Sequence, residues 1–106
     1  PFAFHSDCGI TPSNPLFTGG CAVNRLTASG RVLGEAEKIS VDQALHAMTL
    51  GAAWTMKMDH LIGSIECGKY ADFTVLEEDP QAIEPVQLKD VKVWGTVLGG
   101  KKQQIQ

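Results

Sequence analysis

Apolar side chains repeat with helical spacing in the middle of the chain. The repeat is formed by Val41, Ala44, Leu45, Met48 and Ala52. This spacing of three or four positions marks one face of a helix. Ser40 stands just before the repeat and Gln43 follows it by three residues, which is a capping box. We therefore expect a helix to begin after Ser40, with Gly51 interrupting or tilting it near its end and a second short helical segment over residues 52–58.

The pattern changes to strand-like stretches after residue 62. Residue Ile65 and the stretches 72–76 and 91–98 are rich in β-favouring side chains, and Val91 and Val93 alternate with Lys92. Residues 77–80 form an acidic turn that ends in proline, which cannot continue a central strand. The pair Gly99-Gly100 predicts a hairpin turn, with residues 101–106 as the returning strand or a frayed tail.

The N-terminal part is less regular. Residues 2–6 are mostly apolar and aromatic and predict a short buried strand. Residues 7–20 contain two prolines and three glycines, which predicts a loop without regular structure. A short helix is expected over residues 21–28, followed by a polar connection over residues 30–39. Helices followed by strands indicate an α+β arrangement for the chain taken alone.

Composition and charge limit the classes of molecule that the protein is expected to bind. The 106 residues are 43% hydrophobic and 20% charged, with a net charge of −3, as in an ordinary globular protein. No basic cluster exceeds Lys101-Lys102, so nucleic acid and anionic membranes are poor partners. No apolar run approaches the roughly 18–20 residues that span a bilayer. Cys8, Cys21 and Cys67 form no CxxC, so we expect reduced thiols and a cytoplasmic protein without a disulfide framework or structural zinc.

Asp7 is the first candidate for chemistry because it stands where the apolar stretch ends and the loop begins. Reacting groups of parallel α/β proteins lie at such strand ends, where a carboxylate can bind a metal or take a proton from water. The alternative is a loop cap that accepts backbone N–H bonds. His5 lies two residues earlier, on the same side of an extended strand. It could share a metal with Asp7 or hydrogen-bond to it, or simply bond to backbone.

The remaining candidates are weaker. His46 and His60 have no partner at metal-ligand spacing, because the chain contains neither HxH nor HExxH. Cys8 beside His5 suggests a small cysteine-dependent hydrolase as a minor alternative. In residues 63–76, Lys69 is placed to meet Glu66 or Asp72, which we interpret as a structural staple between a turn and a strand.

Residues 63–76 (GSIECGKYADFTVL) also resemble the C-terminal signature of the amidohydrolase superfamily, the metal-dependent hydrolases related to urease, dihydroorotase and cytosine deaminase. The helical region (SVDQAL at 40–45, TLGAA at 49–53) and the tail (VKVWGTVLGGK at 91–101) resemble that family's last helices and closing strands. The opening HSDCGITPSNPL at 5–16 is similar to the segment after barrel strand 8 in the branch that acts on amides and formamides.

The resemblance implies a parent α/β protein, a (β/α)8 barrel with one or two divalent metals, zinc foremost, and a small composite β-sandwich. Residues 1–60 would be the last barrel strand, its loop and the final helices, and residues 61–106 a portion of the sandwich. Asp7 matches the family's aspartate, which contacts the metal and acts as acid/base on the activated water. His5 is not part of the family's pattern, and its place beside Asp7 makes it the candidate contact for a small-molecule substrate of the amide type.

Length separates the chain from the complete enzyme. A barrel needs about 250 residues, and the family's other metal ligands have no counterpart among these 106. We therefore expect a C-terminal fragment of a homo-oligomeric amidohydrolase that cleaves non-peptide C–N bonds. The fragment alone is expected to bind no metal and to be inactive. The alternative is a catalytically silent piece that needs its missing part or self-association.

Overall fold

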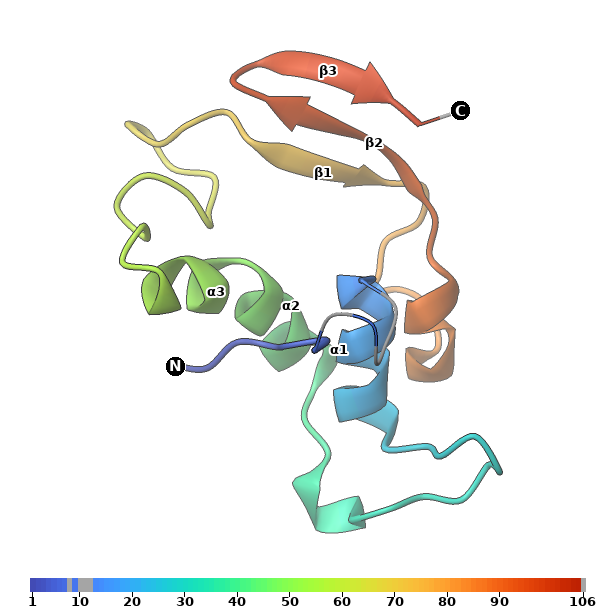
Figure 1. Ribbon diagram of the computed structural model, residues 1–106. Coiled ribbons are helices and arrows are strands. Elements are labelled where there is room, and N and C mark those ends of the chain that lie inside the picture. Colours follow the sequence, from blue (N-terminus) through green and yellow to red (C-terminus); the bar gives the residue numbers. More distant parts are fainter. Residues whose placement is uncertain (8, 10–12, 106) are drawn as a thin grey trace.

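The computed structural model describes residues 1–7, 9 and 13–105. Three α-helices come first: α1 (Pro15–Asn24), α2 (Val41–Met48) and α3 (Leu50–Thr55). Strands β1 (Phe73–Leu76), β2 (Val93–Leu98) and β3 (Lys101–Gln104) follow, and the 3-10 turns η1 (Glu35–Glu37) and η2 (Pro85–Asp90) lie between elements. The helices lie together, and the sheet lies apart from them on one side of the molecule (Figure 1). The α+β prediction for the chain is confirmed.

The capping box at the start of α2 is confirmed. The Gln43 amide donates to the Ser40 hydroxyl at 3.1 Å, and the Ser40 amide donates to the Gln43 side chain at 2.9 Å. The break that follows falls at Thr49, where φ is −116° and ψ is −92°, so α3 begins at Leu50 and not at residue 52. The Thr49 hydroxyl donates to the carbonyl of Leu45 at 2.8 Å, which satisfies the end of α2. Gly51 therefore lies inside α3 and does not cause the break.

The loop predicted over residues 7–20 is wrong in its second half, because α1 begins at Pro15. The side chain of Asn14 accepts hydrogen bonds from the amides of Leu16 and Phe17, at 3.1 and 3.4 Å. Proline is well suited to the first helical position, since its missing N–H would have no partner there. The helix also ends earlier than predicted, at Asn24.

The strand predicted over residues 2–6 is not formed. Residues 1–6 are irregular, and the described sheet contains only β1, β2 and β3 in that order. A strand needs a neighbour to pair with its backbone groups, and this segment lies beside helices instead. The side chain of Phe4 packs against the hydrophobic core and holds the segment there.

The sheet is antiparallel throughout. Phe73 pairs with Val97, and Leu98 pairs with Lys101 across the hairpin turn. Gly99 and Gly100 have φ of 57° and 84°, which confirms the predicted turn. Ile65 is not in a strand; it is 84% exposed.

The core joins helices α1 and α2 to the turn η2. Its buried members are Leu16, Val23, Ala44, Leu88 and Val91. Leu88 is fully buried, which anchors η2 on the helices. None of the helices among the described residues is long and apolar enough to cross a membrane.

Candidate functional site

Asp7 lies at the end of the irregular N-terminal segment, where the backbone turns. Its φ is 54°, in the left-handed region, and its side chain is exposed. Aspartate enters this region at less cost than most residues, because its short polar side chain can bond locally. The carboxylate is therefore presented to solvent by a turn of the chain and not by the end of a paired strand.

His5 is bonded to the backbone of this turn. The amide of Asp7 donates to Nδ1 of His5 at 3.0 Å. Because Nδ1 accepts this bond, the neutral ring carries its proton on Nε2. The structure thus favours the interpretation in which the histidine bonds to backbone over direct pairing of the imidazole with the carboxylate.

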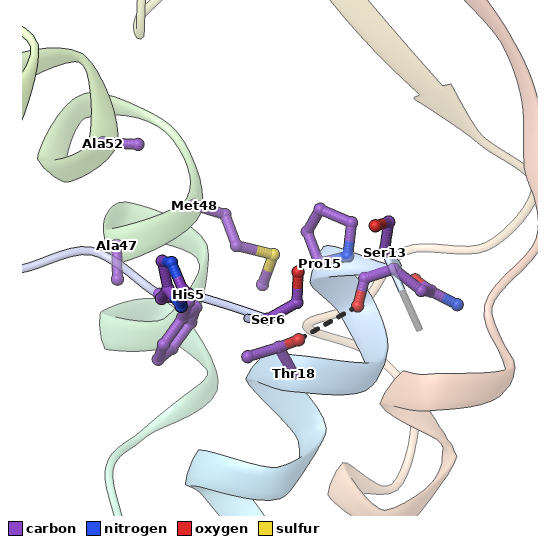
Figure 2. Close-up of a pocket in the computed structure, with 10 residues that line it drawn as sticks. His5, Ser6, Ser13, Pro15, Thr18, Ala47, Met48 and Ala52 are labelled. Atoms are coloured by element: carbon purple, nitrogen blue, oxygen red, sulfur yellow. Dashed lines mark hydrogen bonds between the residues drawn. The ribbon is translucent and has the colours of Figure 1, made fainter. Parts of the chain in front are cut away.

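A hollow of about 250 Å³ opens beside His5, between the N-terminal segment, α1 and the α2–α3 pair. Figure 2 shows the side chains around it. Its described lining consists of Phe4, His5, Ser6, Ser13, Asn14, Pro15, Thr18, Ala47, Met48 and Ala52. The hydroxyl of Thr18 donates to the carbonyl of Asn14 at 3.3 Å, the dashed line in Figure 2. The described lining is hydroxyl-bearing on one side and apolar on the other, and carries no Asp, Glu, Lys or Arg.

The described residues do not form a complete metal centre. Within the part of the chain that the structure describes, no three His, Cys, Asp or Glu side chains lie close enough to hold an ion. Asp7 and His5 are of the right chemical type to contribute ligands, but the others would have to come from outside the described residues. His46 and His60 are exposed and join no such group. Cys8 lies outside the described residues.

Residues 64–69 form a tight polar cluster that supports the turn before β1. The Ser64 hydroxyl donates to the carboxylate of Glu66, and Lys69 Nζ lies 2.7 Å from Ser64 Oγ and 3.0 Å from Glu66 Oε2. The Ser64 hydrogen bond, followed by the hydrogen bond and positive charge of Lys69, lowers the pKa of Glu66. Of the two partners predicted for Lys69, Glu66 is the one it contacts.

Of the described residues that line the hollow, only His5 is predicted from the sequence to contact a substrate. Asn14 caps α1, Thr18 lies in the first turn of that helix, and Met48 ends α2. The dipeptide Asn14-Pro15 is the sequence signal for the start of α1, because Asn at the N-cap and Pro at the first helical position are typical of a helix start.

Comparison with known proteins gives the family. The chain matches the amidohydrolase family over residues 1–102. The chain belongs to this family. Its sequence is 36% identical over 99 residues to YtcJ of Bacillus subtilis, an amidohydrolase by its name, covering 91% of the chain and 19% of YtcJ.

Two further relatives of this amidohydrolase chain have more specific names. One is the N-substituted formamide deformylase of Arthrobacter pascens, 33% identical over 94 residues, with 88% of the chain and 17% of the relative covered. The other is the imidazolonepropionase of Bacteroides fragilis, 30% identical over 93 residues, with 88% of the chain and 22% of the relative covered. No solved structure matches the chain at a significant level. The chain therefore spans about a fifth of the length of these relatives, and its family implies a barrel parent.

Proposed function

We propose that these 106 residues are the C-terminal part of a metal-dependent amidohydrolase that cleaves amide-type, non-peptide C–N bonds in small molecules. The observation that carries the proposal is the family match over residues 1–102, which includes Asp7 and its turn. The names of two relatives, a formamide deformylase and an imidazolonepropionase, support a carbon–nitrogen substrate.

Asp7 is the acid/base in this proposal. A divalent metal, zinc in our proposal, would be held in part by Asp7 in the complete protein and would supply the positive charge that activates the attacking water. Asp7 takes a proton from that water as the water oxygen bonds to the substrate carbon. Asp7 then gives the proton to the leaving nitrogen as the C–N bond breaks. The exposed position of the Asp7 side chain supports this role, because water and substrate can reach it.

His5 is the substrate contact in this proposal. Its Nδ1 is occupied by the amide of Asp7, so the proton on Nε2 is the group that can donate to a substrate oxygen. The hollow beside it is lined without acidic or basic side chains among the described residues, apart from His5 itself. This lining suits an uncharged substrate.

The test compares the complete protein with the 106-residue chain. Each is analysed for bound zinc and assayed for amine release from N-alkylformamides and from 4-nitroacetanilide. We expect metal and hydrolysis with the complete protein and neither with the chain alone. A complete protein that binds metal and releases no amine from either amide class would contradict the proposed function. Turnover by the chain alone would contradict the assumption that the active site is completed by residues outside these 106.

The alternative, a silent piece that associates with its missing part or with itself, is favoured by the exposed apolar side chains. Ile65 is 84% exposed, Leu98 69% and Trp54 52%. Where the missing part leaves such side chains uncovered, contact between copies would bury them, and on this ground we also propose a homo-oligomeric parent. Cys21 and Cys67 are free and exposed, which supports the proposed cytoplasmic location.

A further inference from the structure

Gly51 lies where the N-terminal segment crosses helix α3. It is buried within this helix, and a Cβ atom at its position would lie well inside 3.0 Å of the carbonyl oxygen of Phe2. The same atom would lie 3.1 Å from the carbonyl oxygen of His46. Both obstacles are backbone atoms, which cannot turn aside as the end of a side chain can. Only glycine at this position lets the segment approach the helix so closely.

The segment that Gly51 admits is the one that carries the site. Phe2 is separated from Asp7 by four residues, and the rings of Phe2 and Phe4 meet edge to face with centroids 5.9 Å apart. Phe4 packs in turn against the core. Residues 1–6 form no strand in the described chain, so strand hydrogen bonds do not fix the distance between this segment and α3. The packing of Phe2 and Phe4 therefore contributes to the position of this segment, and a shift at Phe2 would be passed along the chain toward His5 and Asp7.

We propose that Gly51 is a positioning residue for Asp7. The absence of a side chain at residue 51 sets the distance between α3 and the N-terminal segment, and so sets where the carboxylate of Asp7 stands. The proposal rests on the proposed function for its catalytic consequence. Its structural half, the docking of the segment on α3, is tested separately.

Gly19 provides a matched control. It too is a buried helical glycine beside the segment, and a Cβ there would lie 3.7 Å from the ring of Phe4. The one tight contact, at 2.7 Å, is with the terminal methyl of Met48, which can rotate away. Gly19→Ala thus makes the same chemical change without forcing the backbone of the segment outward.

The experiment uses the complete protein and the variants Gly51→Ala and Gly19→Ala. Hydrogen exchange of the peptide covering residues 2–7 reports docking, and kcat and KM for an N-alkylformamide report catalysis. We expect faster exchange in Gly51→Ala and a kcat lower by about 100-fold with little change in KM, because a displacement of about 1 Å in a catalytic group has this effect. Gly19→Ala should resemble the unmodified protein in both respects.

Several results would overturn the positioning role. Exchange of residues 2–7 that is equal in Gly51→Ala and the unmodified protein would do so, whatever the activity. Equal losses in both variants would do so as well, since they would indicate a general effect of filling the helix interface. If Gly51→Ala does not fold, Phe2→Ala decides, since it removes the ring contact with Phe4 and leaves Gly51 in place. Faster exchange of residues 3–7 in this variant supports docking by packing, and unchanged exchange refutes it. Absence of hydrolysis by the unmodified protein would instead refute the proposed function, and the exchange comparison would still decide the docking.

Discussion

Glu66 shows how two neighbours act on an exposed carboxylate. The Ser64 hydroxyl donates to it first and Lys69 then adds a hydrogen bond and a positive charge, so the pKa of Glu66 lies below its usual value of 4.5. A carboxyl whose folded pKa is lowered stabilises the fold in its charged form. That contribution is complete above the usual pKa and is lost as the pH falls through the lower, folded value. Since Glu66 is exposed, solvent screening keeps the contribution small.

Replacing Glu66 by Gln tests this linkage. We expect the variant to melt slightly below the unmodified protein at neutral pH, because the charged hydrogen bonds with Ser64 and Lys69 are weakened. The difference should shrink as the pH is lowered from neutral to well below 4.5, because the carboxyl takes up its proton in this range. Thermal unfolding of both proteins across this range is the measurement. A difference that stays constant over the range would show that charge at residue 66 does not stabilise the turn.

At the level of elements, Leu88 anchors η2 on the helices, and it is the largest fully buried side chain among the described residues. Leu88 is fully buried, with a relative solvent exposure of 0%, and it packs in the cluster with Leu16 and Val23. Leu88→Ala should lower the free energy of unfolding by about 2–5 kcal/mol through lost burial and the cavity left behind. Denaturant unfolding measures this loss.

Val86 supplies the control for this prediction, because it lies in the same 3-10 turn and is 51% exposed. Val86→Ala should change the free energy of unfolding by no more than about 0.5 kcal/mol, as is usual for surface positions. Equal effects of the two substitutions would mean that η2 does not anchor the core in the way its burial indicates.

The elements that could be predicted from sequence are those with local determinants. The Ser40–Gln43 capping box and the Gly99-Gly100 hairpin depend on neighbouring residues only, and both are confirmed. The strand over residues 2–6 needs a neighbouring strand, which no local pattern supplies, and that prediction is wrong for the described chain. The loop prediction treats Pro15 as a helix breaker and so misses the start of α1, because proline at the first helical position favours the helix.

The candidate site divides in the same way. His5 and Asp7 are predicted as site residues because residue type and position next to an apolar stretch can be read directly from the sequence. The proposed positioning role of Gly51 cannot be predicted from the sequence in this way, because it depends on the close approach of Phe2, which is 49 positions away in the chain. Contacts between distant segments are fixed by packing, and the sequence offers no short-range signal for them.

At the scale of the whole molecule, the chain corresponds to only a part of the length of its relatives. It matches the amidohydrolase family over residues 1–102 and spans 17–22% of the relatives compared. The backbone amide of Asp7 donates to His5, and among the described residues no three His, Cys, Asp or Glu side chains lie close enough to hold a metal ion. The exposed apolar residues, such as Ile65 and Leu98, are surfaces that the remainder of the proposed parent protein would cover.

The central claim is that Asp7 is the acid/base of the complete hydrolase. The most direct test replaces Asp7 by Asn, which keeps the size of the side chain and removes its ability to take up a proton. The measurement is kcat for an N-alkylformamide, with circular dichroism to show that the fold is kept. We predict a loss of about 100-fold or more, the range expected for general acid–base catalysis. Turnover that survives within a few-fold in a folded variant would contradict the claim.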